Sequence, residues 1–419
     1  MLSNKKSGST LWTRDFTIIT LGSVVSMFGN SMSGFAMSLM VLDLSKSTLL
    51  YAVYLVMYTL PQLFLPIISG AVLDRFSRKR TIYTLDFISA GLYGFMSVIL
   101  ASGWFSFPIF AGYCFLLGFI QSTYMVAYES FYPLLITEGH FQKAYSIASV
   151  LETVSSVMIP VSTFLYRRIG LAPLLAVNGL CCFIAAVMEM QIRANETYIE
   201  TQKETRRKNV GYGHQVLMDV REGFGYLAEE KGLLAIAIYF AFCSVSGGFS
   251  NVITLPYFKK TFSNGEYWYM LVWGMTLVGR AIGGLFHYKK DLPAAWRYQI
   301  ALAVYIVISL NEGFYLFFPI PVMMVLCFVN GIEGITSYTI RVSAIQSYVP
   351  DEKKGRFNGA FNMISTAGVL LGELAAGMLT LVWPEKIVLM SAMLLCVLAA
   401  VVFIGGGKRH VAVIYNRRQ

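Results

Sequence analysis

The feature that most limits the fold of this chain is its series of long apolar stretches, separated by short polar segments. About 20 apolar residues in a row are enough to cross the hydrocarbon core of a bilayer as a helix. Twelve stretches reach this length, at residues 15–42, 48–73, 80–101, 107–136, 145–166, 172–192, 233–258, 267–287, 296–317, 320–348, 357–382 and 386–405. We therefore predict an all-α membrane protein with twelve transmembrane helices. Most loops are short, so neighbouring helices should be antiparallel.

The composition supports a membrane protein and argues against other classes. Of the 419 residues, 56% are hydrophobic and only 13% are charged, whereas a soluble domain has about 25% charged residues. All six cysteines fall within apolar stretches, which is typical of small buried hydrophobes rather than disulfide partners or metal ligands. The formal net charge of +10 is assigned to loops that meet anionic lipid head groups, and no basic patch with interleaved aromatics predicts a nucleic-acid partner. We expect no cofactor and no metal.

The basic residues are distributed unequally between the two sides of the predicted membrane. With the N-terminus inside, only six of the 33 Lys and Arg residues fall in outer loops, while Arg280 and Arg341 fall within spans. Short loops rich in Lys and Arg remain in the cytoplasm. We therefore predict a multi-pass protein of the plasma membrane with both termini cytoplasmic.

One long polar interval divides the chain into halves. It lies at residues 193–232, and its second part carries apolar residues at helical spacing: Val216, Val220, Phe224 and Leu227. This spacing predicts an amphipathic helix on the inner membrane surface. The expected domains are a six-helix bundle at 1–192, the linker at 193–232, and a second six-helix bundle with a short tail at 233–419.

The two halves also echo each other in sequence. A shift of 213 residues places Gly70 on Gly283 and Lys143 on Arg356. Parallel repeats of six spans are typical of transporters. The echo predicts two pseudo-symmetric six-helix bundles.

The segment between the second and third spans carries a charged motif. It reads Gly70-Ala-Val-Leu-Asp74-Arg75-Phe-Ser-Arg78-Lys79-Arg80. This segment resembles the Gly-x-x-x-Asp-Arg-x-x-Arg-Lys signature of the major facilitator superfamily, with Ser77 where a Gly is often found. The stretch Asp219-Val-Arg-Glu-Gly-Phe-Gly-Tyr-Leu227 resembles the same place in macrolide-efflux and enterobactin-exporter members. The resemblance implies two bundles that open a central cavity to each side of the membrane in turn.

The resemblance also implies that the motif is a conformational gate, formed by Gly70, Asp74, Arg75, Arg78, Lys79 and Glu129. In this gate Asp74 would face the N-terminus of the eleventh span near residues 357–359, where a carboxylate is favoured by about 0.3–1 kcal/mol. Arg78 would pair with Glu129 or Glu138 near the end of the fourth span. The alternative is a turn of solvated charges that only sets the topology. We favour the gate, because Asp74 adds nothing to the positive-inside bias.

Charged residues within the spans are candidates for coupling. Each costs at least about 2.5–3.5 kcal/mol at mid-membrane, so such residues tend to be functional. Our candidates for proton coupling or substrate binding are Asp86, Glu152, Glu333, Glu373 and Arg341. Glu333 and Glu373 lie near the centres of their spans and are the first choices for a proton or cation site. The alternative is structural ion pairing, such as Glu333 with Arg280 or Arg341. Glu189 and Glu312 lie near span ends and are predicted to be interfacial.

Polar and aromatic residues in the first, fourth, seventh and tenth spans suggest the chemistry of the cavity, because the resemblance implies that these spans line it. Asn30, Gln121 and Asn251 would contact a ligand there or hydrogen-bond to a neighbouring helix. The same spans carry many aromatics: Tyr124, Tyr128, Tyr239, Phe242, Tyr257 and Tyr338. A wall of aromatic and Met side chains suits large amphipathic ligands better than sugars.

Two pairs of glycines lie four residues apart within spans. They are Gly279-x-x-x-Gly283 and Gly368-x-x-x-Gly372. Small residues at this spacing allow two helices to approach closely. We predict that these glycines pack helices together rather than bind a ligand.

The motifs of soluble enzymes are missing from the sequence. It contains neither a Gly-x-x-x-x-Gly-Lys-Ser/Thr loop for nucleotides nor a His-Glu-x-x-His zinc motif. We predict that the chain is not an enzyme but a monomeric secondary transporter of small molecules. Its expected activity is proton-coupled export of amphipathic, drug-like compounds. The fourth span lacks the Arg, and the fifth the Gly-Pro motif, that many drug–proton antiporters of the superfamily carry. The alternatives are a nutrient or metabolite uptake permease and a transport-inactive sensor or scaffold.

Overall fold

The computed structural model describes residues 10–73, 77–137, 158–194, 212–289 and 292–417, together with residues 144, 147, 151 and 155. Over these residues the regular structure is helical and contains no strand. Eleven helices of the described part are long and apolar enough to cross a membrane. The remaining predicted span, 145–166, is described mainly over the helix α6 (Met158–Ile169). The all-α membrane class is therefore confirmed.

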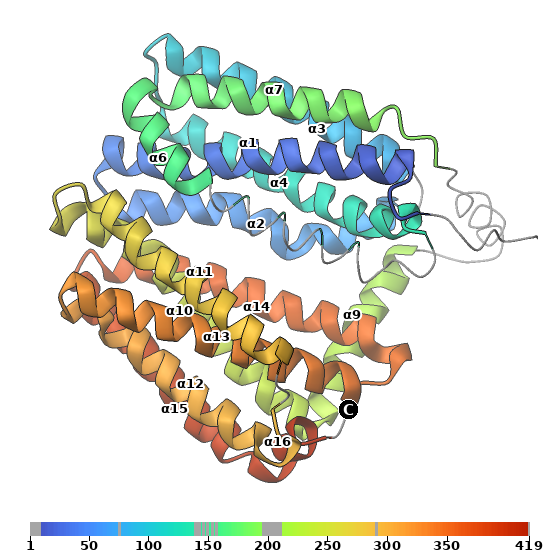
Figure 1. Cartoon of the computed structure of the whole chain (residues 1–419), viewed down its shortest axis with the longest axis vertical. Helices are drawn as coiled ribbons and strands as arrows, with labels where there is room; N and C mark the ends of the chain where they lie inside the picture. The colour runs from blue at the N-terminus through green and yellow to red at the C-terminus, as the bar shows by residue number, and fades with distance from the viewer. Residues whose placement is uncertain are drawn as a thin grey trace, which may run out of the picture. The chain divides into compact units, whose positions relative to one another are not determined.

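The chain divides into two units, whose helices Figure 1 labels. Unit 1 comprises Met1–Leu44 and Met57–Gly213, and unit 2 comprises Ser45–Val56 and His214–Gln419. The helices of unit 1 are α1 (Arg14–Ser45), the larger part of α2 (Thr48–Leu73), α3 (Arg78–Ala101), α4 (Phe107–Phe131), η1 (Tyr132–Leu135), α6 and α7 (Leu171–Glu189). Those of unit 2 are α9 (Tyr212–Glu229), α10 (Lys231–Thr261), α11 (Gly265–Lys289), η2 (Ala294–Trp296), α12 (Arg297–Phe314), η3 (Tyr315–Phe317), α13 (Ile320–Tyr348), α14 (Asp351–Leu379), α15 (Glu385–Ala399), η4 (Ala400–Gly405) and α16 (Lys408–Tyr415).

Helix α3 begins at Arg78, within the charged motif, because Ser77 caps it. Ser77 has an extended backbone, and its hydroxyl accepts a hydrogen bond from the backbone N–H of Arg80 at 3.1 Å. Serine is among the preferred residues at this position, since its side chain satisfies a backbone N–H that the helix leaves without a partner. The residue that departs from the superfamily signature thus has a local structural role.

Helices α3 and α7 lie side by side in unit 1 (Figure 1). Gly179 of α7 permits this approach, because a Cβ atom there would lie 3.1 Å from the carbonyl oxygen of Ala90 on α3. A similar crossing joins α2 and α4, where a Cβ atom on Gly118 would collide with the carbonyl oxygen of Tyr58. Residues without side chains therefore set the spacing of the helices in unit 1.

The predicted glycine pairs pack helices together in unit 2. Gly279 of α11 lies against α13, where a Cβ atom would collide with the carbonyl oxygen of Phe328. Gly372 of α14 lies against α10, where a Cβ atom would collide with the carbonyl oxygen of Val245. The helix pairs α11–α13 and α10–α14 each run side by side (Figure 1). The prediction that both motifs mediate helix packing is confirmed.

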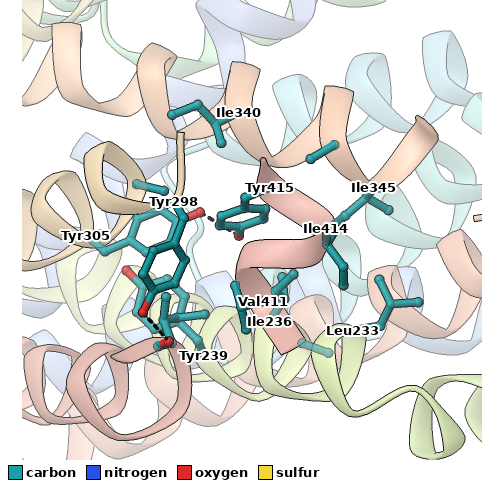
Figure 2. Packing of buried hydrophobic residues seen from close by; sticks show 14 of the residues in the cluster. Leu233, Ile236, Tyr239, Tyr298, Tyr305, Ile340, Ile345, Val411, Ile414 and Tyr415 are labelled. Carbon is teal, nitrogen blue, oxygen red and sulfur yellow. Dashed lines mark hydrogen bonds between the residues drawn. The ribbon is translucent and has the colours of Figure 1, made fainter. Parts of the chain in front are cut away.

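The C-terminal helix α16 belongs to the core of unit 2. Figure 2 shows its side chains Val411, Ile414 and Tyr415 among buried residues of α10, α12 and α13. The hydroxyls of Tyr305 and Tyr415 are hydrogen-bonded at 2.8 Å, and both side chains are buried. The C-terminal segment, which we expected to be only a short tail, is therefore held in place by buried apolar side chains and one hydrogen bond.

Helix α9 lies in the interval predicted to contain an amphipathic helix. Leu227 near its end is buried in the same cluster as α16. Gly223 lies close to the backbone of α14, because a Cβ atom built on Gly223 would be 2.5 Å from the carbonyl oxygen of Arg356. The guanidinium of Arg356 also forms an ion pair with Glu222 of α9 at 2.5 Å. The apolar side of α9 is therefore covered, at least in part, by unit 2 itself.

Candidate functional site

The described residues of the charged motif bind the backbone of unit 1. The guanidinium of Arg78 donates to the carbonyl of Ser130 at 2.9 Å, and the ammonium of Lys79 donates to the carbonyl of Ile192 at 3.0 Å. Both cations stand in the first turn of α3, and they tie it to the C-terminal end of α4 and to the segment after α7. The backbone of Gly70 continues α2, and the side chain of Glu129 is exposed. The predicted site residues Asp74, Arg75 and Glu152 lie outside the described residues, and the gate stays a prediction.

Two carboxyl groups are buried in the interior of unit 1. Asp86 on α3 is 5% exposed and Glu189 on α7 is 0% exposed. The hydroxyl of Tyr124 on α4 donates to Oε1 of Glu189 at 3.4 Å. Glu189 is the last residue of α7, at the end of the span as predicted, but its side chain is packed against Gly22 of α1 and is not exposed.

A cavity of about 560 Å³ opens beside this pair, entirely within unit 1. Four residues predicted from the sequence as site candidates line it: Asn30, Asp86, Gln121 and Glu129. Its wall is otherwise rich in aromatic and Met side chains: Met27, Tyr58, Tyr93, Tyr124, Met125, Tyr128 and Tyr132. A cavity of this size with a few convergent polar groups is typical of a small-molecule site.

Asn30 holds neighbouring helices together as well as lining the cavity. Its Oδ1 accepts hydrogen bonds from Nδ2 of Asn178 on α7 at 3.1 Å and from the hydroxyl of Tyr93 on α3 at 3.3 Å. Nδ2 of Asn178 also donates to the hydroxyl of Ser33 at 2.7 Å, and Asn178 is fully buried. The alternative of an inter-helix hydrogen bond is therefore observed for Asn30.

Unit 2 brings two other predicted residues together. Glu373 on α14 is 2% exposed, and its Oε1 accepts a hydrogen bond from Nδ2 of Asn251 on α10 at 3.4 Å. Its second oxygen, Oε2, has no hydrogen-bond partner among the described residues. The close crossing at Gly248 and Gly372 brings α10 and α14 together near this carboxyl group.

Arg341 is surrounded by aromatic rings instead of carboxylates. Its guanidinium carbon lies 4.5 Å from the ring centre of Phe240, 5.2 Å from that of Phe361 and 5.8 Å from that of Tyr338. Within the described part of the chain, no ion pair joins Glu333 to Arg280 or Arg341, and Oε2 of Glu333 is buried without a partner. The alternative of structural ion pairing for Glu333 is therefore not observed.

The sequence reasoning missed the polar face of α1. Thr20, Ser23 and Ser26 all line the cavity of unit 1. They follow one another at intervals of three residues, which places them on one face of a helix. Polar residues at this spacing inside an apolar span were the signal that would have located the cavity. No group of three or more His, Cys, Asp or Glu side chains within the described ranges is arranged to hold a metal ion.

The long apolar helices define a multi-pass membrane protein. The chain belongs to the Major Facilitator Superfamily, whose sequence profile matches residues 19–373. It is 25% identical over 258 residues to the uncharacterized MFS-type transporter YkuC of Bacillus subtilis (strain 168). That match covers 59% of this chain and 57% of the relative.

Solved structures share the fold across nearly the whole chain. The nucleoside transporter NupG superposes with a TM-score of 0.66 at 10% identity, covering 94% of this chain and 98% of NupG. A bacterial homologue of the iron transporter ferroportin, in its inward-facing state, superposes with a TM-score of 0.66 at 14% identity, covering 94% of this chain and 100% of the homologue. At these identities the similarity establishes the fold and leaves the substrate open.

Proposed function

We propose that this protein is a secondary transporter that exports amphipathic small molecules in exchange for protons. In this proposal the two six-helix bundles alternate in opening to the two sides of the plasma membrane, and both chain termini are cytoplasmic. The protein works as a monomer, with the motif at Gly70–Arg80 as its gate.

The observation that carries the coupling is the environment of Glu373. The carboxyl group of Glu373 is almost fully removed from solvent. One of its oxygens has no partner among the described residues, and the other accepts only from the amide of Asn251, so little in its surroundings stabilises a negative charge. Such a group takes up and releases a proton as access to water changes. Glu333, which also has a buried oxygen without a partner, is the second coupling candidate.

The wall of the unit 1 cavity supports an amphipathic substrate. Aromatic and Met side chains present large, adaptable apolar surfaces. Polar groups lie between these surfaces: the side chains of Asn30, Asp86, Ser89, Gln121 and Glu129 and the hydroxyls of Thr20, Ser23 and Ser26. A ligand with both apolar and polar parts matches this mixed wall.

The test is transport by purified protein in liposomes that contain a pH-sensitive dye. An amphipathic substrate added on one side should draw protons from the other side toward it, and E373Q should abolish this proton movement. Glu312, a half-buried carboxyl of unit 2 that accepts a hydrogen bond from Ser250 at 3.1 Å, provides the matched control E312Q. Proton movement that persists unchanged in E373Q contradicts the coupling role.

Competition separates export of amphipathic compounds from uptake of nutrients. Dyes and macrolides should compete with the transported substrate, whereas sugars, nucleosides and organic acids should not. The reverse order would favour an uptake permease. Absence of substrate-dependent flux under every imposed gradient would favour a transport-inactive sensor or scaffold.

A further inference from the structure

Two of the six cysteines come together in the interior of unit 2. Cys243 lies near the middle of α10 and Cys396 near the end of α15, and their Sγ atoms are 3.3 Å apart. All six cysteines belong to the described part of the chain, and no other thiol pair there is hydrogen-bonded. The two residues are 153 positions apart in the sequence, so the fold alone brings their thiols into contact.

The packing of α10 against α15 holds the thiols at this separation. One turn further along α10, the hydroxyl of Ser246 donates to the carbonyl of Ala392 on α15 at 3.0 Å, and this hydrogen bond is buried. One turn before Cys243, Tyr239 packs in the same buried cluster as Cys396. Residues three or four apart lie on one face of a helix. The contact between the thiols therefore follows from the register of two packed helices.

The separation suits a covalent link between the sulfurs. The sulfurs of a disulfide are about 2.0 Å apart, so the two thiols need to approach each other by roughly 1.3 Å. Small rotations about the Cα–Cβ bonds of both cysteines supply such a movement without separating the helices. Contact alone also fits two small apolar side chains packed together, and the reactivity of the pair distinguishes these two roles.

The two thiols differ in their access to the surroundings. Cys396 is 2% exposed, whereas Cys243 is half-buried, so a small molecule reaches Cys243 first. An accessible cysteine beside a second cysteine that can resolve its oxidised form is the arrangement of thiol redox sensors. Helix α10 is long and apolar enough to cross a membrane. An oxidant that reaches the middle of this helix must therefore be small or lipid-soluble, and uncharged where it reacts.

We propose that Cys243 and Cys396 form a redox modification site, which a hydroperoxide converts into a reversible disulfide between α10 and α15. The sulfur of Cys243 first attacks the terminal oxygen of the hydroperoxide and breaks the O–O bond. Cys243 becomes a sulfenic acid, and the other oxygen leaves with the thiol proton, as water from hydrogen peroxide or as an alcohol from a lipid hydroperoxide.

The second step uses the buried thiol. The sulfur of Cys396 attacks the sulfur of Cys243, so that the S–S bond forms, the S–O bond breaks, and the hydroxyl leaves as water with the proton of Cys396. The two thiols together lose two electrons, and the hydroperoxide gains them. Because the thiols are free in the resting protein, the link is a response to oxidation and not a permanent staple. This site is separate from the proposed transport activity.

The experiment counts thiols in the purified full-length protein in lipid nanodiscs. Reduced protein is treated with hydrogen peroxide in the buffer, or with a phospholipid hydroperoxide placed in the bilayer, and is then denatured and labelled with a maleimide. Wild type should lose two of its six thiols, and a thiol reductant should restore both. Mass spectrometry of peptides should find Cys243 joined to Cys396. The hydroperoxide that forms the link at the lower concentration identifies the phase from which the site is oxidised.

Serine variants test the order of the two steps. C396S should form a sulfenic acid at Cys243 that dimedone traps, since no second thiol resolves it. C243S should leave Cys396 reduced, because that thiol is buried. C327S removes another buried cysteine of unit 2, and it should form the link as wild type does.

The wild-type protein alone can exclude this site, whether or not the variants fold. Retention of all six thiols under both hydroperoxides would show that the pair is packed and unreactive. A disulfide that joins other cysteines would assign the oxidation elsewhere, and dimedone labelling of Cys396 in C243S would overturn the order of the steps. Because the readout is the state of the thiols, a negative result leaves the proposed transport intact, and a protein without flux can still form the link.

Discussion

The hydroxyl of Tyr124 on α4 donates a hydrogen bond across 3.4 Å to the buried carboxyl oxygen Oε1 of Glu189 on α7. Tyr124 also stacks on Tyr128, with ring centres 6.0 Å apart. One aromatic side chain thus joins the cavity wall to the carboxyl pair. The contact gives Glu189 a neutral donor rather than a cation.

Replacing Tyr124 by phenylalanine tests this contact. Y124F keeps the ring stack and removes the donor to a buried carboxyl group, so we expect a loss of about 1–3 kcal/mol in the free energy of unfolding. Thermal unfolding of the purified variant measures the change. Y338F is the control, because Tyr338 is 51% exposed and loss of its hydroxyl should cost less than about 0.5 kcal/mol. Equal unfolding temperatures for wild type and Y124F would show that the long hydrogen bond contributes nothing.

Asn178 makes the central polar contact between α1 and α7. N178L keeps most of the side-chain volume but removes the donor to Asn30 and Ser33, so that Oδ1 of Asn30 keeps only the donor of Tyr93 and the hydroxyl oxygen of Ser33 loses its donor. We expect a loss of about 1–3 kcal/mol for the groups left unsatisfied. The exposed Gln191, just beyond α7, provides the control Q191A, which should lie within about 0.5 kcal/mol of wild type. An N178L protein as stable as the control would mean that Asn30 finds another partner, as the hydroxyl of Tyr93 already offers one.

The cap of α3 gives a graded test at one position. S77A removes the acceptor for the N–H of Arg80 and should cost about 0.5–2 kcal/mol, whereas S77G should cost only a few tenths. Chemical denaturation of both variants measures the difference. Identical stability of S77A and S77G would contradict a capping role. A larger loss in S77A than in S77G would explain why both glycine and serine are suitable at position 77, since each is a favourable N-cap residue.

The sequence predicted the helical class and the glycine crossings because both follow from local rules. A long apolar stretch has few alternatives to a spanning helix, and the pairs at Gly279 and Gly368 carry their packing role in their spacing. Of the two alternatives left open for Asn30, the hydrogen bond to a neighbouring helix is observed, although the sequence did not identify Asn178 as its partner. Choosing that partner requires knowing which helices are neighbours.

The carboxyl pair was beyond sequence reasoning for the same reason. Glu189 lies at the end of a span, where position alone favours an interfacial location, yet it is fully buried. Its burial depends on Gly22 and Tyr124, which come from two other helices. Position along the helix was a sufficient guide for Glu373, which lies well inside its span and is 2% exposed. Lateral burial is set by neighbours that hydropathy cannot identify.

The crossing of α11 and α13 gives the sharpest stability test, because two glycines of one helix differ only in what surrounds them. At Gly279 a Cβ atom would collide with the carbonyl oxygen of Phe328, whereas nothing lies within 4 Å of a Cβ atom at Gly274. G279A must push the helices apart, and we expect a cost of about 1–3 kcal/mol. G274A meets open space and should be neutral or gain up to about 1 kcal/mol from better helix propensity. The two effects should therefore have opposite signs in thermal unfolding measured in the same detergent. Equal destabilisation by both substitutions would show that α11 requires flexible glycines rather than close contact with α13.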